Sequence, residues 1–323
     1  MSFMVLSQRE VQQCIDMKQA ITVMEEAFKE SYLRQTILPL RTPVAVEKEN
    51  ALMLTMPAYL SQKNALGLKV ISVFPNNTAK KKPAINGVML LLNEETGEAQ
   101  AIMEAGYLTA MRTGAVSGLA TKYLAKENAN EVAIIGSGVQ AVTQLEAVAS
   151  VRPIRNVSIW SRSFENSKRF AQKIEDKYEV ECHQTIREAV KNADVICTAT
   201  ASTEPLICLA DLKPDVHINA VGSHTRKMRE INNDVMAKAV IVVDQLEAAL
   251  SEAGEVISAL EERCIRQEDI KELGAIVNAN QTPNQKRITL FKSVGLAIQD
   301  ISIAHAVYMN ALKQGLGTSL SLM

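Results

Sequence analysis

The sequence predicts an α/β protein in which a Rossmann-type, doubly wound parallel sheet is joined to a smaller α+β domain. Three observations predict this fold. From about residue 113, apolar strand-like segments alternate with amphipathic helical segments. A glycine-rich turn follows the first of these strands. The first third of the chain instead contains short extended stretches separated by Asn, Gly and Pro, which is typical of an antiparallel sheet.

The N-terminal third predicts helices followed by a sheet. Ser7 is a good N-cap, and apolar residues recur at helical spacing between Val11 and Phe28, so two helices are expected there. Residues 93–97 predict a hairpin connection. The expected strands of this antiparallel sheet are residues 41–46, 51–56, 66–73, 87–92 and 98–103.

The remaining chain predicts right-handed βαβ units. A helix is expected from about Thr113 to Leu124. Strands are expected at 131–135, 157–161, 180–183, 194–198, 216–221, 239–243 and 287–291, and helices at 140–151, 164–177, 185–192 and 294–314. The last helix is expected to return to the first domain. We therefore expect residues 1–115 with 303–323 to form the smaller domain and residues 116–302 to form the Rossmann domain.

Composition excludes several classes of protein. The 323 residues are 47% hydrophobic, which is enough for two domains with a substantial core. Lys and Arg total 35 and Asp and Glu total 36, so the net charge of −1 favours neither nucleic acid nor an anionic membrane. The five cysteines form no C-x-x-C pair and no histidine pair has ligand spacing, so no metal site is expected. Without a basic leader or a run of about 18 apolar residues, we expect a cytoplasmic protein.

The glycine-rich turn predicts a dinucleotide site. The strand at 131–135 runs into Gly136-Ser137-Gly138-Val139-Gln140-Ala141 and then into a helix. Gly136 permits the tight turn, Gly138 lets the backbone approach a pyrophosphate, and the helix N-terminus supplies N–H groups. The alternative is a tight turn without a ligand. The residues expected to contact the cofactor here are Gly136, Ser137, Gly138, Val139 and Gln140, with Thr198 and Val221 at the ends of later strands.

The end of the second strand favours NADP(H). NAD sites usually place an acidic residue about 20 residues beyond the glycines, where it binds the ribose 2′-hydroxyl. Here the chain reads Ser161-Arg162-Ser163, with no acid before Glu165. A guanidinium and hydroxyl groups suit a 2′-phosphate. NAD(H) remains the alternative if Arg162 is a solvated surface residue.

Three basic residues are candidates for binding a substrate. A cofactor across the carboxyl ends of the strands places the expected substrate between the sheet and the first domain. Arg41, Lys69 and Arg112 all precede this sheet and stand among apolar or small residues. Two arginines can clamp a carboxylate, and a lysine whose pKa is lowered by burial and like charge can transfer protons. Each could instead be an ordinary surface base.

The chain resembles the ornithine cyclodeaminase and mu-crystallin family, which includes an archaeal-type alanine dehydrogenase and reductases of cyclic imino acids. The resemblance extends over nearly the whole chain. Its motifs are Gly67-Leu68-Lys69 with Phe74-Pro75, Leu108-Thr109-Ala110-Met111-Arg112-Thr113-Gly114-Ala115, the glycine turn ending in Gln140-Ala141, Ile218-Asn219-Ala220-Val221-Gly222, and Phe291-Lys292-Ser293-Val294-Gly295 followed by Asp300.

The resemblance implies an NAD(P)-dependent enzyme of small amino or imino acids. It implies a homodimer formed through the first domain, which also binds the substrate. Arg41 and Arg112 would bind the substrate carboxylate, and Lys69 would be the catalytic residue, acting on the α-nitrogen or on its attacking water. Val294 and Gly295 would line the nicotinamide and substrate pocket through their backbone.

This chain departs from the family pattern at a position that distinguishes cyclodeaminases from other members. Cyclodeaminases carry an aspartate shortly after the Asn-Ala-Val-Gly strand, where this chain has His224 beside Arg226 and Lys227. A neutral or anionic substrate end is therefore expected, with His224 lining the pocket. The leading expectation is reduction of a cyclic imino acid such as Δ1-pyrroline-2-carboxylate to L-proline. The alternatives are an alanine dehydrogenase, an ornithine cyclodeaminase, and a mu-crystallin-like protein that binds NADPH and a small ligand. The 4% aromatic content disfavours the last of these.

Overall fold

A computed structural model describes residues 2–280 and 287–321. The chain divides into two compact units, residues 1–112 with 296–323 (unit 1) and residues 113–295 (unit 2). The first division falls inside helix α3 (Ala105–Leu124) and the second just before helix α11 (Ala297–Gln314). These divisions lie three and seven residues before the boundaries expected at 115 and 302. Residues 322 and 323 of the expected C-terminal segment lie outside the described residues.

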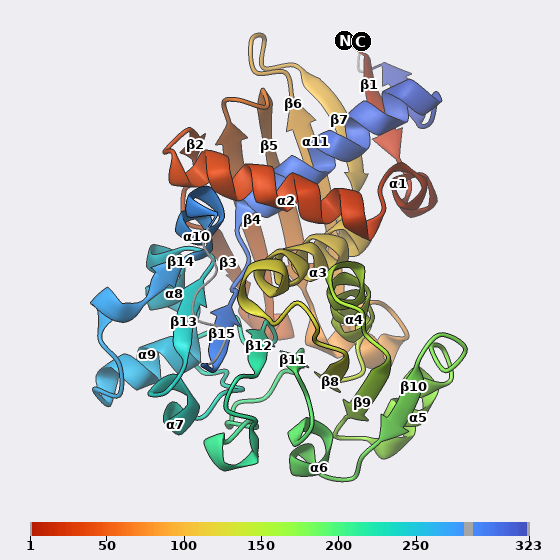
Figure 1. The fold of residues 1–323 in the computed structure, drawn as a ribbon. Coiled ribbons are helices and arrows are strands. Elements are labelled where there is room, and N and C mark those ends of the chain that lie inside the picture. The colour runs from red at the N-terminus through yellow and green to blue at the C-terminus, as the bar shows by residue number, and fades with distance from the viewer. Residues whose placement is uncertain (1, 281–286, 322–323) are drawn as a thin grey trace. The chain divides into compact units, whose positions relative to one another are not determined.

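Unit 1 contains a mostly antiparallel sheet, which the described residues build from eight strands in the order β16-β1-β7-β6-β5-β4-β2, with β3 also pairing β4 (Figure 1). The parallel pairing of β1 with β7 is the exception to the antiparallel pattern. Its strands are β1 (Ser2–Leu6), β2 (Thr36–Ile37), β3 (Thr42–Val46), β4 (Ala51–Leu60), β5 (Ala65–Val73), β6 (Ile85–Leu92), β7 (Ala99–Glu104) and β16 (Thr318–Ser321).

Helices α1 (Gln8–Cys14), α2 (Met17–Tyr32) and α11 belong to unit 1. The N-cap expected at Ser7 is confirmed, because its side chain accepts from Glu10 N and the Glu10 carboxylate accepts from Ser7 N. Helix α2 contacts β4 and α11, and α11 also contacts β5 and β6. These two helices therefore cover one face of the sheet, as Figure 1 shows. The expected return of the last helix to this part of the chain is confirmed.

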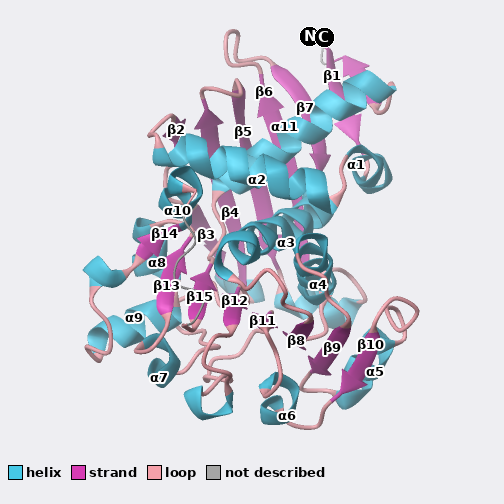
Figure 2. Ribbon diagram, viewed as in Figure 1, coloured by secondary structure: helices cyan, strands magenta, loops and turns pink. Residues whose placement is uncertain are grey.

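Unit 2 contains the parallel sheet predicted from the sequence. Its strands run β10-β9-β8-β11-β12-β15-β13-β14, and every pairing among the described strands is parallel (Figure 2). The order reverses direction between β8 and β11, as in a doubly wound fold. The strands are β8 (Glu131–Ile135), β9 (Asn156–Trp160), β10 (Glu179–Cys182), β11 (Val195–Thr198), β12 (His217–Ala220), β13 (Val240–Val243), β14 (Lys271–Glu272) and β15 (Thr289–Lys292).

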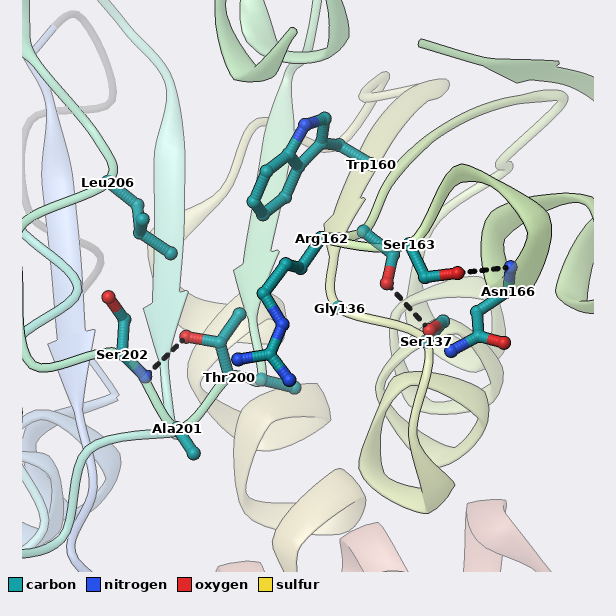
Figure 3. Close-up of a pocket in the computed structure, with 12 residues that line it drawn as sticks. Gly136, Ser137, Trp160, Arg162, Ser163, Asn166, Thr200, Ala201, Ser202 and Leu206 are labelled. Carbon is teal, nitrogen blue, oxygen red and sulfur yellow. Dashed lines mark hydrogen bonds between the residues drawn. The ribbon is translucent and has the colours of Figure 1, made fainter. Parts of the chain in front are cut away.

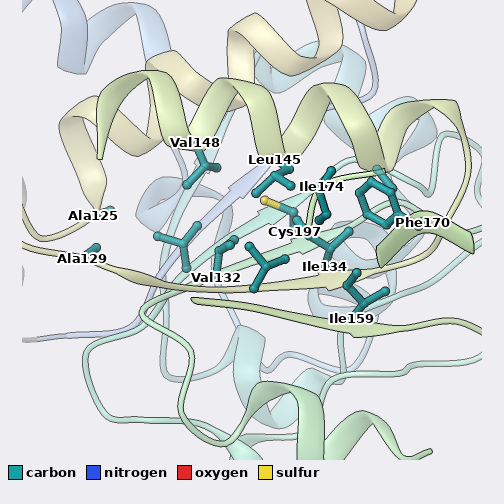
Figure 4. Packing of buried hydrophobic residues seen from close by; sticks show 13 residues of the cluster. Ala125, Ala129, Val132, Ile134, Leu145, Val148, Ile159, Phe170, Ile174 and Cys197 are labelled. Atoms are coloured by element: carbon teal, nitrogen blue, oxygen red, sulfur yellow. The ribbon is translucent and has the colours of Figure 1, made fainter. Parts of the chain in front are cut away.

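Helix α4 forms the centre of the core of unit 2. Its Leu145 and Val148 pack on Val132 and Ile134 of β8, whose side chains share one face because alternate strand residues point the same way (Figure 4). Phe170 joins the same buried cluster. The helices of this unit after α3 are α4 (Val139–Val151), α5 (Phe164–Ala171), α6 (Ile186–Val190), α7 (Asn233–Met236), α8 (Leu246–Glu252), α9 (Gly254–Glu261) and α10 (Leu273–Ala279).

Some expected boundaries were wrong. Helix α3 begins at Ala105 rather than near Thr113, because the Glu104 carboxylate accepts hydrogen bonds from the first N–H groups, those of Gly106 and Tyr107. Helix α5 ends at Ala171 rather than at Lys177. Within the described residues no helix is both long and apolar enough to cross a membrane, and no group of three His, Cys, Asp or Glu side chains could hold a metal ion.

Candidate functional site

A pocket of about 370 Å³ opens at the carboxyl ends of β8, β9 and β11 in unit 2. This is the point at which the strand order reverses, where doubly wound sheets bind their ligands. The residues that line it are Gly136, Ser137, Trp160, Ser161, Arg162, Ser163, Asn166, Ala199, Thr200, Ala201, Ser202 and Leu206 (Figure 3).

The glycine turn has the geometry that a phosphate-binding turn requires. Gly136 adopts φ +125°, and a Cβ there would lie 2.6 Å from the carbonyl oxygen of Ala199, so a side chain is excluded twice over. Gly138 is the N-cap of α4, and a Cβ there would meet no protein atom within 4 Å. Space therefore adjoins the start of a 13-residue helix, where Val139 and Gln140 lie too early for their N–H groups to bond a carbonyl four residues back within the helix. These features fit an anionic group such as a pyrophosphate.

The end of β9 supplies the polar wall of the pocket. The hydroxyl groups of Ser137 and Ser161 lie 2.9 Å apart, and Ser163 caps α5 by accepting from Asn166 N. Arg162 is exposed, and its side chain points into the pocket in Figure 3. The lining residues in the described structure include neither Asp nor Glu. This wall therefore offers hydroxyl groups and one guanidinium.

Glu230 holds the loops beside the pocket together. It is fully buried, and its two carboxylate oxygens accept five hydrogen bonds. The donors are the hydroxyls of Thr198 and Thr200 and the backbone N–H groups of Thr200, Gly222 and Ser223. The carbonyl of Glu230 also accepts from Leu206 N. One carboxylate thereby fixes the segments that follow β11 and β12.

Two expected cofactor contacts at strand ends, Thr198 and Val221, are not among the residues that line this pocket. Thr198 is fully buried and donates its hydroxyl to Glu230, so its side chain does not line the pocket, whereas Ala199 and Thr200 do. Val221 is half-buried, and its N–H donates to the carbonyl of Thr198 within the sheet. Gly138, Val139 and Gln140, at the start of helix α4, are not among the lining residues either.

The Ser293-Val294-Gly295 turn is held by a buried acid that sequence reasoning missed. Asp244 follows β13, and its carboxylate accepts from the Ser293 hydroxyl at 2.7 Å and from the N–H groups of Val294 and Gly295 at 3.0 Å each. Gly295 has φ +85°, which favours glycine. The N–H groups of this turn therefore bind Asp244, and the turn's shape is set before any ligand arrives.

His224 lies exposed on the loop after β12. Its Nδ1 is 3.0 Å from the carbonyl oxygen of Gly222, and because a carbonyl only accepts, Nδ1 carries the proton. The preceding Ser223 is buried: its hydroxyl donates to Glu255 and accepts from Lys292. The base of this loop is therefore fixed while the imidazole remains accessible.

In unit 1, Arg41 and Arg112 both act electrostatically on Lys69. Lys69 is 1% exposed on β5, and its cross-strand neighbours on the same face are Met56 and Met89. Burial, with the like charges of Arg112 and Arg41 adding to it, lowers the pKa of Lys69 to about 8, against the opposing effect of Asp300. Lys69 is therefore poised to exchange a proton near neutral pH.

Arg112 is buried near the middle of α3 and is held on two sides. Its Nε donates to Asp300 Oδ1 at 3.0 Å and its Nη1 donates to Gln299 Oε1 at 2.7 Å. Asp300 Oδ2 lies 2.7 Å from Lys69 Nζ. A guanidinium has five N–H donors, so these two bonds leave donors that could bind an anionic group such as a carboxylate. Arg41 is half-buried just before β3.

Sequence reasoning missed Thr200, Asn166 and Gln299 as contributors to these sites, and it named Asp300 only as part of a motif. Gln299 and Asp300 carried a usable signal, since they are adjacent polar residues among the mainly apolar, buried residues of the first half of α11. Gln299 Nε2 is buried without a hydrogen-bond partner in the described structure, which fits a ligand acceptor beside Arg112.

Comparisons with known proteins extend over nearly the whole chain. Residues 1–315 match the ornithine cyclodeaminase/mu-crystallin family. A Δ1-pyrroline-2-carboxylate reductase of Bacillus cereus is 38% identical over 323 residues, covering 98% of this chain and 99% of that protein. Two solved structures, each with a TM-score of 0.94, are also similar.

The first of these structures is the Δ1-pyrroline-2-carboxylate reductase of Thermococcus litoralis in complex with NADH and L-proline. It is 40% identical, covering 98% of this chain and 99% of the other. The second is an archaeal alanine dehydrogenase dimer with bound NAD, 34% identical with full coverage of both chains. The family match over nearly the whole sequence and these identities lead to one conclusion: this chain belongs to the ornithine cyclodeaminase/mu-crystallin family.

Proposed function

We propose that this protein is an NAD(P)-dependent oxidoreductase that reduces a cyclic imino acid such as Δ1-pyrroline-2-carboxylate to L-proline. The observation that carries the proposal is the buried group of Lys69, Arg112 and Asp300, which offers a carboxylate-binding guanidinium beside a proton-donating ammonium. Its support is the 38% and 40% identity, over nearly full length, to two proteins of that named activity.

The side chains of unit 1 suit this substrate in three respects. Arg112, with Arg41, binds the carboxylate and so orients C2 of the ring toward the hydride donor. Holding the reacting atoms in this geometry lowers the activation barrier. Lys69 keeps the imine nitrogen protonated, because an iminium accepts hydride more readily than a neutral imine. Met56 and Met89 beside Lys69 offer apolar contacts to ring methylene groups rather than a charge for a second ammonium. When bound, the nicotinamide cofactor supplies the hydride.

The proposed cofactor is NADP(H), with NAD(H) accepted more weakly. The support for this preference is the pocket wall of Ser161, Arg162 and Ser163 without an acidic lining residue. The similar reductase and dehydrogenase structures hold NADH and NAD. Both cofactors therefore belong in the test.

Alanine dehydrogenase activity is the second candidate. Its support is the 34% identity to the archaeal enzyme and the fact that pyruvate also presents a carboxylate to Arg112. Ornithine cyclodeamination is disfavoured, because His224 stands where an acid would be needed for the side-chain ammonium. A purely ligand-binding role, as in mu-crystallin-like proteins, does not require a lysine of lowered pKa.

One assay separates these functions. NADPH and NADH absorbance is followed with Δ1-pyrroline-2-carboxylate, with Δ1-piperideine-2-carboxylate, and with pyruvate plus ammonium, while ornithine is incubated for product analysis. Oxidation of the cofactor with the cyclic imines alone supports the proposal. Oxidation with pyruvate and ammonium alone supports the dehydrogenase, proline from ornithine supports the cyclodeaminase, and no turnover with any substrate contradicts enzymatic function in this set.

We also propose that the protein forms a homodimer through the sheet of unit 1. The face opposite α2 and α11 carries Val44, Leu68, Val88 and Leu90, and Val44 and Val88 are 47% and 45% exposed. Apolar residues exposed along one sheet face favour association. The similar alanine dehydrogenase was solved as a dimer. Sedimentation of wild type as a dimer and of Val88→Arg as a monomer is expected; a monomeric wild type at micromolar concentration contradicts it.

A further inference from the structure

Asp300 contacts both functional cations of unit 1. It lies in the first turn of α11 and is fully buried. Its Oδ2 is 2.7 Å from Lys69 Nζ, and its Oδ1 accepts from Arg112 Nε at 3.0 Å. A carboxylate at a helix N-terminus is favoured by the helix dipole. One buried anion thus faces the proposed proton donor and the proposed carboxylate-binding group.

Gly67 lets Asp300 come close to Lys69. It lies two residues before Lys69 on β5, so a side chain at this position would point to the same face of the sheet. A Cβ at Gly67 would lie 3.3 Å from Ile301 Cδ1 and 2.4 Å from the carbonyl oxygen of Leu90. The missing side chain therefore lets α11 lie close to the strand, and Asp300, the neighbour of Ile301, reaches Lys69.

The charges around Lys69 come from three elements. Helix α3 contributes Arg112 and the segment before β3 contributes Arg41, and both oppose the ammonium form. Helix α11 contributes Asp300, which favours that form. Strands β4 and β6 present Met56 and Met89, which cannot solvate a charge. Asp300 is therefore the anion that counteracts burial and the two arginines.

We propose that Asp300 is a positioning residue of the reaction, which keeps Lys69 in its charged, proton-donating form and fixes the guanidinium of Arg112. This inference rests on the proposed imine reduction. In that reaction C2 gains the hydride, the imine nitrogen gains a proton from Lys69, and Lys69 is reprotonated from solvent. Without the anion, Lys69 is uncharged over more of the working pH range and the nitrogen is not protonated.

The test is the pH dependence of turnover in Asp300→Asn. The amide keeps the shape of the carboxyl group but removes its charge, so the basic limb of the kcat profile is expected to move at least about one pH unit lower. Asp300→Glu retains the negative charge, so the basic limb of its kcat profile is expected at the same pH as in the wild type. Gln299→Met is the matched control, since Gln299 holds the same guanidinium as a neutral group: the KM for the imine rises and the limb stays.

A second readout does not depend on turnover. Lysine labelled with ¹³C at Cε is titrated by NMR, and the Lys69 signal is assigned by its loss in Lys69→Met. A lower titration midpoint in Asp300→Asn supports the proposal, and an unchanged midpoint overturns it, whatever the rate does. If the wild type reduces no imine, the proposed function fails, while the titration still decides whether Asp300 sets the charge of Lys69.

Discussion

Replacing Glu230 by Gln tests how the cofactor pocket is held. The carboxylate accepts from five donors, and each of its oxygens faces at least one backbone N–H, that of Thr200 or that of Gly222. An amide has one accepting oxygen and one donating NH₂ group, so in either orientation a buried N–H faces another donor. A hydroxyl can rotate to accept, but a backbone N–H cannot. One unsatisfied buried donor costs about 2 kcal/mol.

This loss predicts two measurable changes. A cost of about 2 kcal/mol lowers the Tm of a unit of this size by about 4–8 °C. The Kd for NADPH is expected to rise about tenfold, or about 1.4 kcal/mol, because Thr200 and Leu206 line the pocket and are both held by Glu230. Differential scanning calorimetry gives the first value, and quenching of intrinsic fluorescence by NADPH gives the second.

Glu204→Gln is the matched control, because Glu204 is exposed in the same region of the chain and should tolerate the change. Burial raises the pKa of Glu230, so a protonated side chain is the competing state. A Glu230→Gln variant with wild-type Tm and NADPH affinity would refute the reasoning, since it would mean that the carboxyl group is already neutral and that the loops do not need its charge.

Three further variants test separate parts of the account. Arg162→Ala should weaken NADPH binding at least tenfold more than NADH binding in fluorescence titrations, whereas Arg155→Ala, at the other end of β9, should change neither; equal losses for both cofactors would remove the argument for a 2′-phosphate site. Lys69→Met should lower kcat at least 100-fold with the NADPH Kd within twofold, because Lys69 is outside the unit that contains the pocket; a variant with most of its rate would show that the lysine has no chemical role. Burial lowers the pKa of His217 to about 3. The folded state therefore keeps His217 neutral while the unfolded state takes up a proton below about pH 6.5. This stability contribution, present above pH 6.5, is lost as pH falls toward 3, by about 2 kcal/mol at pH 5. The Tm decrease between pH 7.5 and pH 5 should therefore be smaller in His217→Gln, and an equal decrease would contradict a neutral His217.

The parallel sheet could be predicted because its signals are local. Buried parallel strands carry continuous apolar runs, and residues 131–135 were placed without error because Gly136 ends the run. The antiparallel strands after Pro39 were also found, since Asn, Gly and Pro separate them. Strands β1 and β16 were missed, because their pairing joins segments near opposite ends of the chain, such as Ser2 with Ser321, which come together only on folding.

The contacts within the sites are non-local, which is why sequence reasoning found the cations and not their partners. Arg112 and Asp300 are 188 residues apart, and Glu230 and Thr198 are 32 apart. A basic residue in an apolar setting predicts burial, but the acid that balances it is found only when the chain has folded. Thr198 was expected at the cofactor for its place at a strand end, yet its hydroxyl is bound to Glu230.

Transfer of deuterium from the cofactor to the product is the most direct measurement of the proposed imine reduction. The protein is incubated with Δ1-pyrroline-2-carboxylate and NADPH carrying deuterium at C4 of the nicotinamide, and the product is analysed by mass spectrometry and NMR. L-Proline with deuterium at Cα is expected, formed in equal amount to the NADP⁺ released, and no such product is expected with Lys69→Met. Oxidised cofactor without labelled proline, or the same labelled yield from the variant, would contradict this expectation.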